Sequence, residues 1–157
     1  MRIIVIGEIC EDVFVYGESK RLSPEAPVPV FNPSYTEENP GMGGNVVENL
    51  MSMDNTLSIN FIHQHEPITK TRYVEEKSNH MFLRVDEGDN YTLGNSDIKN
   101  IKFNEYDIVI VSDYNKGFIS DNDLIEISKR AKLSIIDSKR KLTQEIIQYF
   151  HFIKLNK

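Results

Sequence analysis

Two patterns of hydrophobic residues alternate along the chain. Continuous apolar runs occupy three segments: 2–6 (RIIVI), 106–111 (YDIVIV) and 133–136 (LSII). Such runs are typical of strands that are buried on both faces of a parallel sheet. Apolar residues at helical spacing follow Asn45 and Ser120, and Ser120 with Asp123 resembles a capping box. The chain is therefore predicted to be α/β, with a mostly parallel sheet flanked by helices on both faces.

Shorter segments with partial alternation predict a second group of strands, at residues 13–16, 28–31 and 35–38. Pro27 and Pro29 flank the apolar residues of the middle segment, and proline cannot donate a hydrogen bond to a strand ladder. We therefore expect these strands outside the main sheet, as a small β lid over about residues 13–38. The alternative is a surface hairpin packed on its own domain. Two further segments, 69–76 and 80–87, alternate enough to predict an antiparallel pair.

The glycine-rich turn Pro40–Asn45 (PGMGGN) links the predicted lid to the first long helix. Gly43 and Gly44 let the backbone approach a ligand, and the amides that open a helix can meet an anion or a hydroxyl oxygen. Asn45 carries two donors and an acceptor, which suit a ligand hydroxyl, although it is also a candidate N-cap. Residues 8–12 are predicted to form the loop that leaves the first buried strand, at the edge of the sheet where α/β proteins bind ligands. Asp12 is the candidate ligand contact in this loop, and its alternative role is to form a turn.

Two other segments place charged residues where a ligand can bind. Asp113 and Lys116 lie in the loop SDYNKG after the second buried strand. Lysine is a mobile point charge for an anion, and a solvated turn lysine is the alternative. Arg84 lies on the predicted strand 80–87, and its guanidinium group matches the geometry of a phosphate. A solvated or ion-paired strand arginine explains Arg84 equally well.

Three segments in a fixed order, GEICEDVFVYG, RLSPEAPVPV and NPGMGGNVVENL, are similar to the amino-terminal half of the ribokinase-like (PfkB) sugar kinases. Within that family the chain most resembles the heptose-7-phosphate kinase domain of the ADP-heptose synthases. The resemblance continues through TKTR, LRVD, SDYNKG and DSK, and so covers nearly the whole chain. It implies a sugar-phosphate site formed by Asp12, Gly43, Gly44, Asn45, Arg84, Asp113 and Lys116. It also implies that Lys139 and Asn156 lie toward the nucleotide and metal side.

In the resembled family, a following half carries the glycine-rich anion hole, the catalytic aspartate and most of the Mg-ATP pocket, so no catalytic residue is assigned here. We expect residues 1–157 to form a single truncated domain, a heptose-phosphate kinase-like protein that keeps the sugar-binding half. It resembles a phosphotransferase but is expected to be inactive as an isolated chain. Expected partners are a sugar phosphate, a second copy bound through the lid, and a separate nucleotide-binding half. The alternatives are a non-catalytic sugar-phosphate-binding, dimerisation or regulatory protein derived from such a kinase, and a remnant that keeps only structural order.

Composition narrows the other classes of function. The formal net charge of -6 argues against nucleic-acid binding, which favours a basic surface. Cys10 is the one cysteine, so no internal disulfide can form, and we expect it to be a packed residue in a reducing cytoplasm. No apolar run approaches the length of a membrane span. His63 and His65 lack a third ligand at metal-site spacing, so no metal site is predicted.

Overall fold

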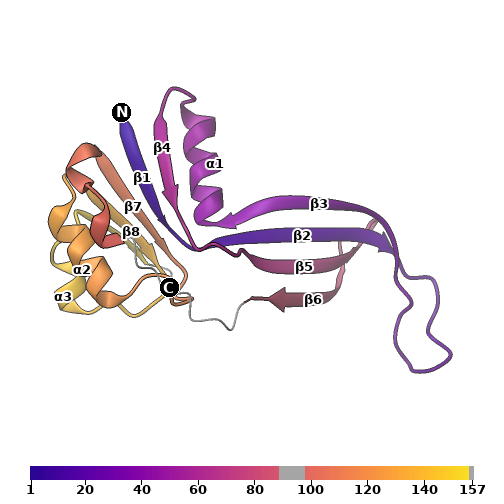
Figure 1. Ribbon diagram of the computed structural model, residues 1–157. Helices are drawn as coiled ribbons and strands as arrows, with labels where there is room; N and C mark the ends of the chain where they lie inside the picture. The colour runs from indigo at the N-terminus through magenta and orange to yellow at the C-terminus, as the bar shows by residue number, and fades with distance from the viewer. Residues whose placement is uncertain (89–97, 156–157) are drawn as a thin grey trace.

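The computed structural model describes residues 1–88 and 98–155, which form a main sheet and a second sheet that projects from it (Figure 1). The main sheet has five strands in the order β4-β1-β7-β8-β9, and all its neighbouring strands are parallel. These strands are β1 (Arg2–Gly7), β4 (Ser58–Ile62), β7 (Ile108–Asp113), β8 (Ser134–Ser138) and β9 (Phe152–Leu155). The parallel α/β architecture predicted from the apolar runs is confirmed.

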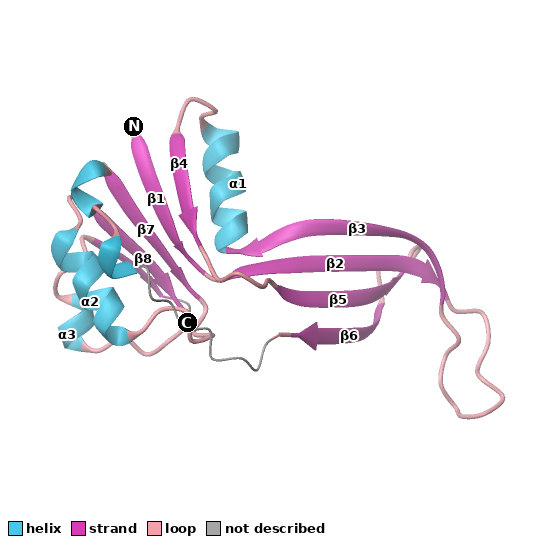
Figure 2. Ribbon diagram, viewed as in Figure 1, coloured by secondary structure: helices cyan, strands magenta, loops and turns pink. Residues whose placement is uncertain are grey.

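Helices cover both faces of the main sheet, with α1 on one face and α2 and α3 on the other (Figure 2). Because side chains alternate along a strand, Ile4 and Ile6 of β1 point into the core that contains residues of α2 and α3. The helices are α1 (Gly43–Met53), α2 (Asp121–Arg130), α3 (Gln144–Ile147) and the short 3-10 helices η1 (Ile98–Asn100) and η2 (Phe103–Glu105). None of the helices in the described ranges has the length and apolar character needed to cross a membrane.

The second sheet, which we call the lid, has four strands in the order β3-β2-β5-β6. β2 pairs antiparallel with β3 and parallel with β5, and β5 and β6 form the predicted antiparallel pair. The strands are β2 (Ile9–Glu18), β3 (Asn32–Met42), β5 (Ile68–Glu75) and β6 (Met81–Glu87). The lid therefore extends beyond the expected residues 13–38, because β5 and β6 complete it.

One predicted strand of the lid is wrong. Residues 28–31 belong to the loop between β2 and β3, where an isolated bridge joins Leu22 and Pro29. Pro27 and Pro29 lack the N–H groups that a strand ladder requires, so the apolar residues beside them cannot pair continuously. By contrast, residues 9–12, which follow the first apolar run and were expected to form a loop, are the start of β2.

Candidate functional site

The junction of the lid with the main sheet places Asp12 against the glycine-rich turn. Asp12 lies on β2 two residues after Cys10, which pairs with Gly41 of β3. A Cβ atom on Gly41 would lie 2.5 Å from Asp12 Oδ2, so a larger residue there would require the carboxylate to shift. Arg72 Nη1, from β5, donates to the other oxygen, Oδ1, at 2.6 Å. One oxygen of Asp12 is thus held in an ion pair, and the other lies against the turn.

Glu8, between β1 and β2, connects the glycine-rich turn to the loop after β7. Its backbone oxygen accepts a hydrogen bond from Gly43 N at 2.8 Å, and a Cβ atom on Gly43 would lie 2.9 Å from this same oxygen. The Glu8 carboxylate is fully buried, and its two oxygens accept from Tyr114 N and Lys116 N, each at 2.9 Å. Glu8 therefore fixes the glycine-rich turn and loop 113–117 in one position relative to each other.

Asp113, an expected site residue, is enclosed by donors from the protein itself. Its side chain is fully buried, and Arg140 donates to both of its oxygens, at 2.6 Å and 2.8 Å. Ser138 Oγ donates to Oδ2 at 2.5 Å, and Asn115 N donates to Oδ1 at 3.0 Å. Because buried polar groups require partners, these hydrogen bonds explain how a carboxylate is accommodated there. The structure places Asp113 beneath the surface of the site.

The start of α1 decides between the two roles considered for Asn45. The N-cap of α1 is Met42, and the helix begins at Gly43, so Asn45 is not the N-cap. Asn45 is exposed in the first turn, where its Oδ1 accepts from Asn49 Nδ2 at 3.1 Å. Gly43 and Gly44 are both buried. At the start of α1, Asn45 is therefore the residue whose side chain can reach a ligand from solvent.

A small apolar cluster closes the junction from the inside. It contains Cys10, Met42 and Ile68, with the ring of Tyr114 packed against it. Burial raises the pKa of the Cys10 thiol to about 11, so the thiol stays protonated near neutral pH. The expectation that Cys10 is a packed residue is confirmed by this cluster. Burial also raises the pKa of Tyr114.

One face of the lid carries a row of charges outward from Asp12. Strand pairing places Lys70 opposite Asp12, and Asp86 opposite Lys70. Arg84 donates to both oxygens of Asp86, each at 2.6 Å, and these hydrogen bonds lower the pKa of Asp86 below its ordinary value. Arg84 is therefore ion-paired in this structure, as one of its two interpretations required. A ligand phosphate would compete with Asp86 for the same guanidinium group.

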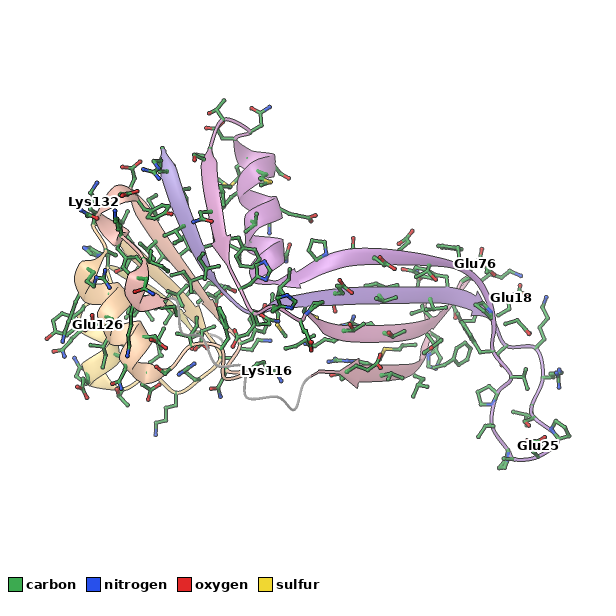
Figure 3. The ribbon with its side chains drawn as sticks, in the orientation of Figure 1. Glu18, Glu25, Glu76, Lys116, Glu126 and Lys132 are labelled. Carbon is green, nitrogen blue, oxygen red and sulfur yellow. The ribbon has the colours of Figure 1, made fainter. Side chains whose placement is uncertain are left out.

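The expected lysines lie at the carboxyl end of the main sheet. Figure 3 shows Lys116 near the point where the lid joins this sheet. Lys139 N donates to Asp113 O at 2.9 Å, and Lys139 Nζ lies 4.0 Å from the centre of the Tyr114 ring. Lys139 therefore borders loop 113–117. Asn156, the other residue expected on the nucleotide side, lies outside the described residues.

Within residues 1–88 and 98–155, no three His, Cys, Asp or Glu side chains are grouped to hold a metal ion. Gly43 N, an amide at the start of α1, already donates to the Glu8 backbone oxygen. It is thus committed within the protein, whereas a helix that binds phosphate offers its first amides to the ligand.

The structure brings only some of the expected site residues together at the junction of lid and main sheet. The segments that carry Asp12, Gly43 and Lys116 meet through contacts of Gly41 and Glu8. Asn45 and Arg84 lie beside this junction, and Asp113 lies beneath it. Three residues that hold the junction were not among the expected ones, namely Glu8, Arg72 and Arg140. Of these, Glu8 and Arg72 carried a sequence signal, through their places in GEICEDVFVYG and TKTR.

Comparison with known proteins gives sequence relatives for most of the chain. No protein-family model matches it. The chain is 34% identical to the bifunctional protein HldE of Helicobacter pylori strain J99 over 89% of its own length, and 30% identical to that of Campylobacter fetus over 90%. In each case the match covers 38% of the relative. The chain thus spans well under half the length of these curated relatives.

Solved structures of sugar kinases share the fold. The ribokinase of Thermotoga maritima superposes with a TM-score of 0.54 at 16% identity, covering 99% of this chain and 59% of that one. An Arabidopsis thaliana ribokinase complexed with ribose and ATP gives a TM-score of 0.52 at 11% identity, covering 98% of this chain and 59% of that one. At these identities the likeness establishes the fold of the chain and leaves its ligands undefined.

Proposed function

The chain is a member of the ribokinase-like (PfkB) sugar kinase family, and from this premise we propose that it binds a phosphorylated sugar of the heptose type at the junction of lid and main sheet. In this proposal, Asp12 accepts hydrogen bonds from ligand hydroxyls through Oδ2, the oxygen that Arg72 does not hold. The Asn45 amide binds a further hydroxyl. Lys116 and Arg84 bind the phosphate, as a point charge and as a planar fork respectively.

The contact between Asp12 and Gly41 carries the proposal. A partly exposed carboxylate lies against a glycine where any Cβ atom would displace it, so the turn is shaped around that oxygen. An ionised carboxylate offers only acceptors, which suits the hydroxyl donors of a sugar. The same turn continues through buried Gly43 into the helix that presents Asn45.

Calorimetric titration with a heptose 7-phosphate tests this function. Asp12→Asn should weaken binding by about tenfold or more, because a hydrogen bond to a charged group is lost. Glu126→Gln is the matched control, since it also removes one negative charge, from an exposed position on α2 (Figure 3). The sugar without its phosphate should bind more weakly than the phosphorylated form. Equal affinity of the Asp12→Asn variant and the unaltered chain would exclude Asp12 from the site.

We further propose that phosphoryl transfer needs polypeptide beyond residues 1–157, from the remainder of a longer protein or from a separate nucleotide-binding chain. The match to 38% of HldE and the partial coverage of ribokinase support this. So does the outer strand β9, where Phe152 is 60% exposed although parallel strands are normally covered on both faces. A coupled assay with Mg-ATP and a heptose phosphate should show far less than about one turnover per second. Turnover at that rate or faster would contradict the proposal.

We also propose that two copies of the chain associate through the lid. The lid face opposite Asp12 carries a hollow of about 520 Å³, lined by Val28, Pro29, Phe31, Pro33, Tyr73, Phe82, Leu83 and Val85. Leu83 is 55% exposed and Val28 is 50% exposed, and a contiguous apolar patch of this kind commonly marks an interaction surface. This hollow supports the second candidate function, a non-catalytic dimerisation or regulatory protein. Binding of a sugar phosphate without any turnover, even when a nucleotide-binding half is present, would favour that function.

A further inference from the structure

Arg140 ties together three segments that are distant in the sequence. It follows β8 in an irregular segment, and its side chain is 11% exposed. Nε and Nη2 donate to the two oxygens of Asp113, while Nη1 donates to Asp121 Oδ1 at 2.7 Å and Nη2 also donates to Ile119 O at 2.7 Å. The guanidinium group therefore joins the end of β7, the start of α2 and the segment after β8.

Loop 113–117 is held by two buried carboxylates, those of Glu8 and Asp113. Tyr114 N and Lys116 N donate to Glu8, and Asn115 N donates to Asp113. Three successive amides of the loop are thus satisfied by carboxylate oxygens. Asn115 has a φ of 58°, a left-handed conformation that asparagine tolerates better than other residues with a Cβ atom. The three hydrogen bonds and this turn residue together define the conformation of the loop.

Arg140 is the charged partner of the buried Asp113 carboxylate in this loop. A charge removed from water is costly unless it is paired and hydrogen-bonded. Burial alone would lower the pKa of Arg140, but the hydrogen bonds and charges of Asp113 and Asp121 raise it above its ordinary value. Without Arg140, the buried Asp113 side chain would keep Ser138 Oγ and Asn115 N as donors, and a turn of this carboxylate toward water would release Asn115 N.

We propose that Arg140 is a positioning residue: through Asp113 it fixes loop 113–117, and with it Lys116, in the conformation that binds the phosphorylated sugar. Arg140 does not touch the ligand. Asp113 acts as the internal anchor of the loop and leaves the ligand contact to Lys116. The inference rests on the proposed sugar-phosphate site, because it explains how one part of that site is preorganised.

Arg140→Lys tests the inference, because lysine keeps the charge but lacks the planar fork that reaches both Asp113 oxygens and α2 together. Amide hydrogen exchange at residues 114–116 of the unliganded chain should become about tenfold faster or more, while exchange in β1 stays unchanged. Affinity for a heptose 7-phosphate should fall by about tenfold. Arg130→Lys is the matched control, since Arg130 donates to Lys99 O and Ile101 O at the other end of α2.

The outcomes separate this inference from the proposed function. Unchanged exchange at residues 114–116 in Arg140→Lys overturns the inference, and so does faster exchange with unchanged sugar-phosphate affinity. If the unaltered chain binds no heptose 7-phosphate, the proposed function fails by itself, and the exchange data still report whether Arg140 holds the loop. Should Arg140→Lys fail to fold, Asp121→Ala removes one exposed partner of Arg140 and should raise exchange at the same amides by about threefold.

Discussion

Met42 adopts a backbone conformation that favours glycine, between two glycines that do not adopt it. Its φ is 54° and its ψ is -125°, whereas Gly41 and Gly43 both have ordinary negative or extended φ values. Those two glycines are needed for space instead, beside Asp12 and beside Glu8. The sequence PGMGGN indicates that this turn requires glycine, but only the packing reveals which requirement applies at each position.

Substitution of Met42 separates backbone strain from side-chain burial. Met42 is 5% exposed, so losing its side chain should destabilise the fold by about 2 kcal/mol or more. Alanine keeps the strain, whereas glycine relieves it, and such strain is worth about 1–3 kcal/mol. Met42→Ala should therefore be less stable than Met42→Gly by roughly 1 kcal/mol, after the greater flexibility of unfolded glycine is counted. Urea denaturation measures both; the reverse order would show that Met42 is not strained.

The raised pKa of Cys10 gives two measurable consequences. A thiol reagent at pH 8 should react slowly with the native chain and rapidly in urea, because the thiolate is the reactive form. The folded pKa of about 11 lies above the ordinary value of 9.0, so the unfolded chain loses this proton first as the pH rises. The free energy of unfolding should then decline between about pH 9 and about pH 11. Cys10→Ala should show a smaller decline over that range; an identical decline would assign the effect to other groups.

Among the elements, the buried strands and the antiparallel pair β5 and β6 were predicted from the sequence, whereas the extents of β2 and β3 were underestimated. The runs RIIVI, YDIVIV and LSII became β1, β7 and β8, because a strand buried on both faces must be apolar throughout. β2 was predicted too short, because the acidic residues Glu11 and Asp12 near its start resemble a loop. Only the structure shows that Arg72 of β5 pairs with Asp12 there. The structural roles of Glu8 and Arg140 could not be predicted from the local sequence, because the hydrogen-bond partners of their side chains lie between 19 and 108 residues away.

The start of α2 shows a local signal that was read correctly. Ser120 Oγ accepts from Asp123 N at 3.2 Å, and Asp123 Oδ2 accepts from Ser120 N at 3.0 Å, which completes the predicted capping box. Ser120→Ala should lower the free energy of unfolding by about 1 kcal/mol. Thr143→Ala is a matched control, because Thr143 is the N-cap of α3 but makes no capping hydrogen bond with its side chain. Equal losses in thermal denaturation would show that the cap contributes nothing specific.

At the scale of the whole molecule, the two faces of the lid differ in character, one charged and one apolar. Asp12, Lys70, Arg84 and Asp86 share one face through strand pairing and ion pairs. Side chains alternate along a strand, so Leu83 and Val85 project from the opposite face, over the apolar hollow. A sheet of only four strands cannot bury both faces by itself, so the proposed association through the lid would cover its apolar face.

Substitution of the exposed apolar residues tests association through the lid. Leu83→Glu combined with Val85→Glu should give a folded monomer by light scattering, because both residues are exposed and the main core is untouched. Met53→Glu, on an 82% exposed residue of α1, is the matched control and should leave the association unchanged. An unaltered oligomer in the double variant would place association elsewhere, for example at β9, and a monomeric unaltered chain would remove the proposal.

The order of strands along the chain has a consequence for how the protein is made. All four lid strands end by residue 87, whereas β7, the inner neighbour of β1, begins at residue 108. Chains emerge from the ribosome amino end first, at about 5–20 residues per second. Asp12 and Arg72 can therefore meet before β7, loop 113–117 and Arg140 have been synthesised. The lid strands can therefore pair before the main sheet is complete, and β7 and Arg140 join the junction of lid and main sheet last.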